Sequence, residues 1–177
     1  MVTQKDAIRA SVIDTAERMC TAAITAPKAR GNDTIAVAYL TGDELLAFAD
    51  SMDKFSGESE TAAKIFPRDA ECVRKADAVV IIGSRRIRRW LIPCGLCGFE
   101  NCAASAESGA HCSFDDIDLG IAIGSAVSVA ADNRVDTRVM YTIGYAAMKQ
   151  KLLGDDIETI MGIPLSATHK NILFDRK

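Results

Sequence analysis

The stretch "DAVVIIG", residues 77 to 83, places five apolar residues in a row in front of a glycine, and four of the five are β-branched. Because β-branched side chains favour an extended backbone, the run predicts a β-strand. The similar run "TIAVAYL" at 34 to 40 predicts a buried strand before it. A third strand is predicted for "IETIMGIPL" at 157 to 165.

Helical patterns lie between and around these runs. Apolar residues recur at steps of three and four from Ile8 to Ala23, which predicts an amphipathic helix over residues 4 to 24. Pro67 is expected to separate two helices, because proline suits the first turn of a helix and disrupts its interior. The further helices are expected from Thr41 to about Met52, at 59 to 65, from Pro67 onward, from 114 to about 132 and from about 139 to 153.

Helices outweigh strands in this pattern, and the two kinds of element alternate along the chain. The alternation predicts an α+β fold, a three-layer sandwich around a central sheet. With 177 residues, the chain is long enough for one domain that buries roughly 70% of its unfolded surface. Residues 1–177 are therefore expected to form a single domain.

Composition and charge argue against several classes of protein. The chain is 49% hydrophobic and 25% charged, and its net charge of −3 offers no general attraction to nucleic acid, which is not expected as a partner. The longest apolar stretch, 119 to 131, is shorter than the ~20 residues that cross a bilayer and is interpreted as a buried helix. In it, Gly120 and Gly124 share one face, which would allow another backbone to approach closely.

The six cysteines are interpreted through the compartment. The first residues lack the continuous apolar core of a secretory signal, so we expect a cytoplasmic protein, in which reducing conditions disfavour disulfides. Four cysteines lie within residues 93–113, in the spacing Cys94-x2-Cys97-x4-Cys102-x9-Cys112. Four soft thiolates on a short loop suit either an iron–sulfur cluster or a tetrahedral zinc ion.

Two glycines favour the cluster over zinc. Gly95 and Gly98 each follow a cysteine and can take up positive φ. That conformation would turn backbone N–H groups toward the bridging sulfides of a cluster, which a zinc ion lacks.

The segment "CGLCGFENCAASAES" and the cysteine that follows it resemble the four-iron, four-sulfur module of electron-transport complex B subunits and corrinoid iron–sulfur proteins. The resemblance implies that Cys94, Cys97, Cys102 and Cys112 are the ligands of a 4Fe-4S cluster. The gap before Cys112 is shorter than those families usually show, so His111 is an alternative fourth ligand. Structural zinc and unliganded thiols stay open as other interpretations.

A second resemblance covers most of the chain. "AITAPKARGND", the strand after it and "ADAVVIIG" look like the first half of flavin-dependent nitroreductases. "DIDLGIAIGSAVSVAADNRVDTRVMYTIGYAA" and "IMGIPL" look like their second half, and the whole chain is similar to a prokaryotic family of uncharacterised proteins that contain a ferredoxin domain. The resemblance implies a nitroreductase-like three-layer sandwich with a central, mostly antiparallel sheet and an inserted cluster segment. It also implies a homodimer, with the flavin between the two chains.

FMN is the second cofactor that the nitroreductase resemblance implies. Those enzymes hold the FMN phosphate with an N-terminal Arg-Arg-Ser-type motif, which this chain does not reproduce. A compact anion needs several converging donors. The candidate phosphate ligands are Arg9 in the first helix, Lys28 and Arg30 in the loop after it, and Lys170 and Arg176 in the tail. A solvated surface charge is the alternative interpretation of each.

The stretch "RRIRRW", residues 85 to 90, puts four arginines in front of the cysteine loop. Their charge could offset that of a thiolate-ligated cluster, dock an acidic redox partner protein, or form a solvated face. Two function classes follow. One is a redox protein, including a flavin and iron–sulfur oxidoreductase; the other is a zinc-stabilised, non-catalytic module that binds a protein or RNA partner.

Overall fold

The computed structural model describes residues 1–174 of the chain. Its strands form one sheet in the order β1-β2-β4-β3, in which neighbouring strands are antiparallel. The three predicted strands are confirmed, and a strand of two residues, β3, joins them. The strands are β1 (Ile35–Thr41), β2 (Ala78–Arg85), β3 (Asp136–Thr137) and β4 (Ile157–Ser166).

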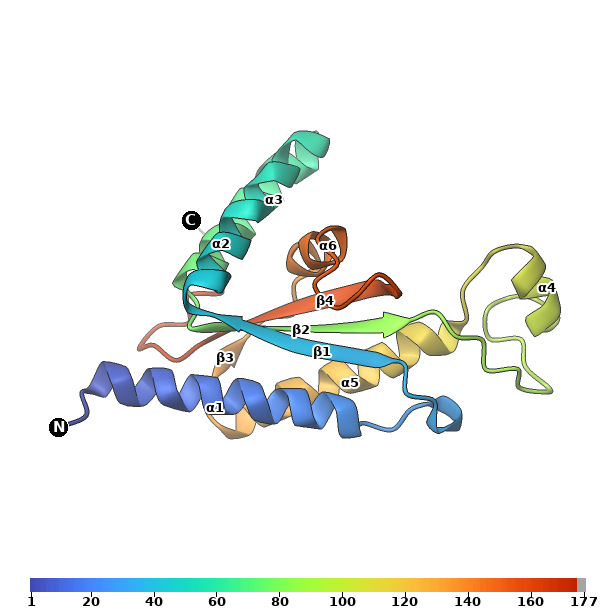
Figure 1. Cartoon of the computed structure of the whole chain (residues 1–177), viewed down its shortest axis with the longest axis horizontal. Helices are drawn as coiled ribbons and strands as arrows, with labels where there is room; N and C mark the ends of the chain where they lie inside the picture. Colours follow the sequence, from blue (N-terminus) through green and yellow to red (C-terminus); the bar gives the residue numbers. More distant parts are fainter. Residues whose placement is uncertain (175–177) are drawn as a thin grey trace.

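Two layers of helices cover the two faces of the sheet (Figure 1). On one face lie α1 (Gln4–Thr25) and α5 (Ser113–Asp132). On the other face lie α2 (Gly42–Met52), α3 (Glu60–Lys75) and α6 (Tyr141–Lys149). The short helix α4 (Cys102–Glu107) stands outside these layers, and two 3-10 turns, η1 (Ala29–Gly31) and η2 (Asp53–Glu58), lie in the connections. The predicted three-layer sandwich with an antiparallel sheet is confirmed.

Strand β2 shows why its sequence is apolar without interruption. Val80 and Ile82 belong to the core between the sheet and the α1–α5 layer, whereas Val79 and Ile81 belong to the core on the opposite face. Each of the four is at most 1% exposed. Successive side chains of a strand point to opposite faces, so a strand with both faces covered needs apolar residues at every position.

Helix α6 packs closely on β4. A Cβ atom at Gly144 would stand 1.8 Å from the carbonyl oxygen of Ile160 and 2.8 Å from the Cα of Met161. Only a residue without a Cβ allows the two backbones to come this close. Gly144 therefore fixes the distance between the helix and the sheet.

The helix break predicted at Pro67 is wrong, because α3 runs through that residue. Buried residues on both sides of it, including Phe66 and Ala70, form one continuous apolar stripe against the core. Proline cannot donate to the carbonyl of Ala63, but Pro67 itself is exposed, so water can satisfy that carbonyl. Continuous burial outweighs the local cost of the proline.

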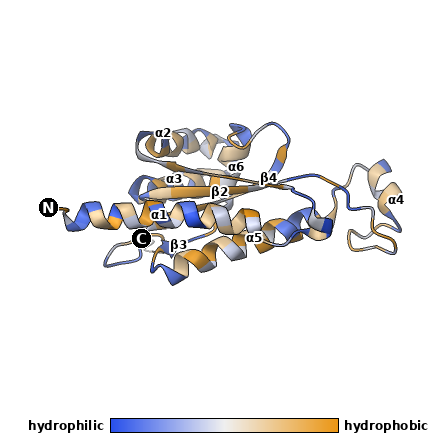
Figure 2. Cartoon of the chain, turned by 60° about the horizontal axis from the view of Figure 1, so that its bottom comes forward, coloured by the Kyte–Doolittle hydropathy of each residue, from blue (hydrophilic) through white to orange (hydrophobic). Residues whose placement is uncertain are grey.

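Helix α5 is apolar along most of its length (Figure 2), yet it is buried on one face only. Ile117 and Ile121 are 42% and 41% exposed. Gly120 and Gly124 have no atom within 4 Å of the place where a Cβ would stand. The interpretation as a core helix is therefore right for one face of α5, whose residues Leu119, Ala122 and Ala126 are buried, and its other face is exposed. No backbone of the described chain approaches the two glycines. Within residues 1–174, no helix is both long and apolar enough to span a membrane.

Candidate functional site

Residues 86–112 leave the sandwich at the end of β2 and return at the start of α5 (Figure 1). We call this projection the cysteine lobe; it carries α4 and the four clustered cysteines. The structure describes all 27 residues of the lobe. Three of them are buried: Arg89, Ser105 and Cys112. The lobe therefore has almost no hydrophobic core of its own.

The four cysteines come from separate segments of the lobe. Cys94 and Cys97 lie on the loop that leads to α4, and Cys102 is the first residue of that helix. Cys112 immediately precedes α5. Cys112 is buried, and the other three are partly exposed.

A tight turn joins the first two cysteines. The N–H of Gly98 donates to the carbonyl oxygen of Gly95 at 3.0 Å, and Gly98 has a φ of +82°. Of the two glycines that can take up positive φ, Gly98 does so, and Gly95 is not among the residues with positive φ. As the first residue of the turn, Gly95 only accepts the closing hydrogen bond and needs no special backbone conformation.

The donor set suits a thiophilic metal group, although the side chains do not enclose one. Among residues 1–174, no three His, Cys, Asp or Glu side chains lie close enough together to hold a metal ion. The residues nevertheless fit in kind and in location, because four soft thiolates on one lobe are the ligands that iron–sulfur clusters and zinc take. Binding would require the separate segments of the lobe to draw together.

The pKa values of two cysteine thiols, one in the lobe and one in the sandwich, are shifted in opposite directions. The pKa of the Cys97 thiol is lowered, chiefly by a hydrogen bond from the backbone N–H of Phe99, and the positive charge of Arg88 adds to the effect. Burial instead raises the pKa of Cys20, on α1, to about 11. Because metals are bound by the thiolate, the environment of Cys97 favours ligation and that of Cys20 opposes it.

Arg88 lies inside the lobe. Its Nη2 donates to the carbonyl oxygens of Ser105, at 3.1 Å, and Ala110, at 2.6 Å. Ser105 belongs to α4, and Ala110 lies in the link between α4 and α5. One guanidinium therefore joins the outgoing segment of the lobe to its returning segment.

Arg89 is the buried anchor at the base of the lobe, with a side chain that is 1% exposed. Its Nη2 donates to Oδ2 of Asp118 at 2.6 Å, and its Nη1 donates to Oδ1 of Asp115 at 3.1 Å. Burial raises the pKa of Asp115, and the hydrogen bonds and charge of its donors oppose the rise. Asp118 also accepts from the N–H of Ala29 in η1 at 3.1 Å, while Nη1 of Arg30 donates to the carbonyl of Arg89 at 2.7 Å. The network ties the lobe, α5 and the η1 loop together.

The four arginines of residues 85–89 therefore do not form one charged face. Arg85 pairs with Asp156 at 2.5 Å, and Arg86 pairs with Glu158 at 2.8 Å. Arg89 is buried, and Arg88 binds carbonyls. A solvated arginine face is thus wrong for this stretch, because each arginine has found its own partner elsewhere in the chain.

The buried acidic pair escaped the sequence reasoning, although a signal for it exists. Asp115 and Asp118 are one helical turn apart, on the face of α5 that also carries Leu119 and Ala122. Two acidic residues inside a buried apolar stripe need a buried cation nearby. The arginine-rich stretch is the natural source of one, but its pairing across 26 and 29 residues requires the fold.

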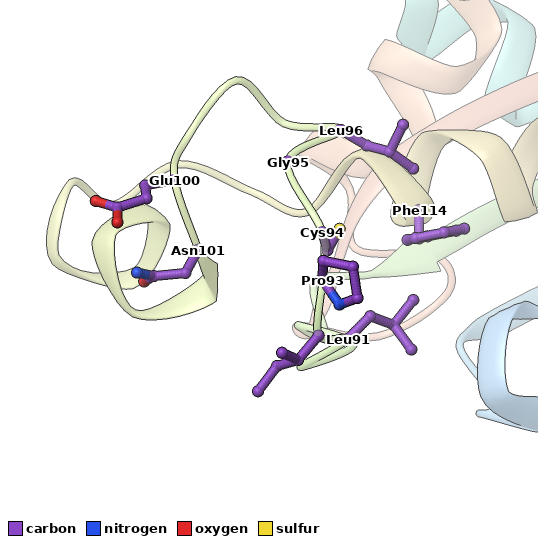
Figure 3. Close-up of a pocket in the computed structure, with 9 residues that line it drawn as sticks. Leu91, Pro93, Cys94, Gly95, Leu96, Glu100, Asn101 and Phe114 are labelled. Carbon is purple, nitrogen blue, oxygen red and sulfur yellow. The ribbon is translucent and has the colours of Figure 1, made fainter.

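A hollow of about 670 Å³ opens on the lobe beside Cys94 (Figure 3). Leu96 and Phe114 lie on one side of Cys94, and Glu100 and Asn101 lie on the other (Figure 3). Ile92 and Leu96, which also line it, are 95% and 63% exposed. One predicted ligand is thus reachable from solvent through a largely apolar opening.

The candidate phosphate ligands do not converge on one place. Arg9 lies near the start of α1, whereas Lys28 and Arg30 follow its end. At 1.5 Å per residue, these places are roughly 25 Å apart. Lys170 follows β4, and its neighbour His169 lines a hollow at the start of α1. Arg176 lies outside the described residues.

Lys28 and Arg30 are the described candidates at the end of the molecule that carries the lobe, and both have partners. Nζ of Lys28 donates to the carbonyls of Ile24 and, at 3.2 Å, Ala26, which caps the C-terminal end of α1. Arg30 donates to the backbone of the lobe through Arg89. The loop that holds both is therefore fastened to the base of the lobe.

His111, the alternative fourth ligand, is paired with a carboxylate. Its Nε2 lies 2.8 Å from Oδ2 of Asp116, and both side chains are about half exposed. This contact is a surface pairing at the start of α5. Cys112, next to it in the chain, is buried.

Comparison with other sequences identifies relatives. A family profile described as "Uncharacterized protein containing a ferredoxin domain" matches residues 108–176, a range that includes Cys112 and excludes the other three clustered cysteines. An uncharacterised protein from Archaeoglobus fulgidus is 41% identical over 184 aligned residues, covering 99% of this chain and 97% of the archaeal one.

Solved structures share the fold at low identity. A nitroreductase-like family protein from Bacillus cereus superposes with a TM-score of 0.62 at 10% identity, over 93% of this chain and 79% of its own. A nitroreductase from Lactococcus lactis in complex with nicotinic acid gives 0.60 at 13% identity, over 91% and 79%. An oxidoreductase containing FMN gives 0.59 at 13% identity, over 89% and 67%. The fold is therefore nitroreductase-like, as predicted.

Proposed function

Because this chain belongs to the family of uncharacterised proteins that contain a ferredoxin domain, we propose that it is an electron-transfer protein whose cysteine lobe holds a 4Fe-4S cluster. The ligands would be Cys94, Cys97, Cys102 and Cys112. The family and the nitroreductase-like fold together suggest a redox role. The cluster is the specific form of that role that we propose.

One observation carries the proposal: all four cysteines lie in the part of the molecule that lacks a hydrophobic core. A segment of this size needs some other source of order, and a metal group bound by four thiolates supplies it. Cys97 lies in the turn closed by Gly98, and Cys102 is the first residue of α4, so these two ligands come from separate segments of the lobe. Drawing them together would close the lobe on the group.

When bound, such a cluster exchanges single electrons at a potential set by charge, hydrogen bonds and exposure. The residues of this chain hold the lobe in place for that exchange. The Arg89 network fixes its base to α5, and Arg88 joins its two segments. The opening beside Cys94 would let a redox partner protein approach the group.

FMN is proposed as a second cofactor, because the fold is shared with an oxidoreductase containing FMN. Lys28 and Arg30 are the candidate phosphate ligands that lie beside the lobe. A flavin there could trade two electrons with a substrate and one with a cluster. Flavin released by denaturation and identified by its fluorescence would support this cofactor, and its absence from protein refolded with FMN would contradict it.

The exposed face of α5 supports a homodimer. Ile117 and Ile121 are partly exposed there, and the open glycines Gly120 and Gly124 would let a second helix approach. Light scattering should give twice the mass of one chain, and Gly124→Glu should give the mass of one chain. A wild-type protein that is monomeric at high concentration would contradict the dimer.

Metal analysis of protein purified without oxygen tests the cluster. We expect about four iron and four acid-labile sulfide per chain, with a brown colour that dithionite bleaches. Cys94→Ser should lose most of the iron and colour, whereas the matched variant Cys20→Ser, outside the lobe, should keep both. A colourless wild-type protein with one zinc per chain would instead support the zinc-stabilised binding module.

A further inference from the structure

Arg88 differs from the other arginines of its stretch because it has no carboxylate partner. Arg85, Arg86 and Arg89 each form an ion pair with an aspartate or a glutamate. Among the residues that the structure describes, no acidic side chain lies within ion-pair distance of Arg88. Its hydrogen bonds go to two neutral carbonyls, those of Ser105 and Ala110.

The surroundings of Arg88 leave its charge uncompensated. The residue is half-buried, and its Nε is buried without a hydrogen-bond partner in the described part of the chain. A guanidinium stays protonated in proteins, and a partly buried charge without a counter-ion is unfavourable. A negatively charged group close to the guanidinium of Arg88 would therefore stabilise the lobe.

The acidic residues that line its cavity form ion pairs with other arginines, although Oδ2 of Asp115 has no hydrogen-bond partner among the described residues. Arg88 lines a cavity of about 330 Å³ that also borders Cys112, Asp115 and Glu158. Asp115 pairs with Arg89, Glu158 pairs with Arg86, and His111 at the rim pairs with Asp116. The other carboxylates of the lobe, Glu100 and Glu107, are exposed, and the clustered thiols are the further groups of the lobe that ionise. Cys112 borders the same cavity, and Cys102 opens the helix whose Ser105 carbonyl Arg88 binds.

We propose that Arg88 is the counter-charge of the thiolate-ligated group in the cysteine lobe. This inference rests on the proposed function. It assigns the balancing of the cluster's negative charge to Arg88 alone, because the other arginines of residues 85–89 are paired with carboxylates. A cluster held by four thiolates is net negative, and reduction adds one more electron. A cation fixed beside it stabilises the reduced form more than the oxidised form. Arg88 therefore positions the lobe and raises the reduction potential of the group that the lobe holds.

The experiment compares Arg88→Met, Arg88→Lys and the matched control Arg86→Met, which removes a charge that lines the same cavity but is paired with Glu158. Each protein is reconstituted with iron and sulfide without oxygen and titrated electrochemically, with circular dichroism to verify the fold. Arg88→Met should disfavour reduction at least tenfold, a shift of about −59 mV for one electron. Arg88→Lys should shift much less, and Arg86→Met should match the wild type.

The outcomes separate this inference from the proposed function. A wild-type protein without iron would sink both at once. If the wild type holds a cluster and Arg88→Met has an unchanged potential, the counter-charge is refuted and the cluster stands. Should Arg88→Met fold but fail to load, loading of Arg88→Lys would support the role of charge. Equal failure of both variants would show that the two carbonyl contacts matter rather than the charge, and would overturn the inference.

Discussion

The sandwich and the cysteine lobe are held together by different forces. In the sandwich, apolar side chains fill two cores, one on each face of the sheet. The lobe buries three residues, and the arginines 88 and 89 hold it by hydrogen bonds. Hydrophobic burial is non-directional and tolerates variation, whereas a polar anchor depends on a few atoms. The sandwich therefore has its own source of stability, whereas the lobe depends on a few polar contacts.

The largest expected effect is at the junction of the two regions. Arg89→Met would leave Asp115 and Asp118 buried without their cation, which should cost about 3–5 kcal/mol of unfolding free energy. Denaturant unfolding measures the loss. Adding Asp115→Asn and Asp118→Asn should restore part of it, because the unpaired charges disappear.

Arg86→Met is the control for this prediction. Its ion pair with Glu158 is about half exposed on both sides, so the loss should be within about 1 kcal/mol. Equal stability of the Arg86 and Arg89 variants would show that the junction is not a buried anchor.

The next largest effect is expected for a substitution within the sandwich. Gly144→Ala would force a methyl group against the backbone of β4 and should destabilise the protein by roughly 3 kcal/mol. Gly57→Ala, in η2, meets open space and should change stability by no more than about 0.5 kcal/mol. Thermal unfolding of both variants checks the difference, and a Gly144→Ala protein as stable as the wild type would contradict the close packing of α6 on β4.

A smaller effect is expected for proteolysis of the lobe, which requires the lobe to open locally while the sandwich stays folded. Chymotrypsin should cut metal-free protein first near Leu96 and Phe99, because the loop there is exposed and weakly held. Mass spectrometry of early fragments identifies the site. Loading with iron and sulfide should slow this cleavage, and first cuts in α1 or the sheet would reverse the assignment of the weaker region.

The smallest effect is chemical and compares one thiol from each region. In metal-free protein, the alkylation rate of each cysteine rises with pH as its thiolate forms. The rise for Cys20 should be centred at about 11, and the rise for Cys97 should come at lower pH than for an ordinary cysteine. Peptide mapping after iodoacetamide treatment separates the two. Coinciding profiles would mean that burial of Cys20 and the Phe99 hydrogen bond to Cys97 have no consequence.

The sandwich was predictable because burial leaves a periodic signal. The strands at 34–40, 77–83 and 157–165 and the first helix follow from apolar spacing alone. The local preference of Pro67 predicts a break that does not occur, because the buried apolar stripe of α3 continues past it. The exposed face of α5 was also missed, since an apolar sequence does not tell which side of a helix meets the sheet.

The four cysteines as ligands of a metal group stay a prediction from the sequence, whereas the hydrogen bonds and ion pairs that hold the lobe could not be predicted from it. Four cysteines at close spacing indicate a metal group in any fold. The roles of Arg88 and Arg89 depend on contacts with residues 17 to 29 positions away, so adjacent arginines with the same composition end in different environments. The proposed phosphate ligands separated for the same reason, because α1 places Arg9 and Lys28 at opposite ends.

The hydrogen bond between Ile87 and Asp115, where the lobe joins the sandwich, lowers the entropy cost of binding a ligand in the lobe. The N–H of Ile87 donates to Oδ1 of Asp115 at 3.3 Å, joining residues 28 positions apart. Closing a free chain of that length costs about 3 kcal/mol by the (3/2)RT ln n relation. In this protein the sandwich has already closed the loop before any ligand arrives. In a free peptide with the same four cysteines, the free energy of metal binding would be reduced by this loop-closure cost. The four cysteines should therefore bind a metal more tightly in this protein than in the peptide.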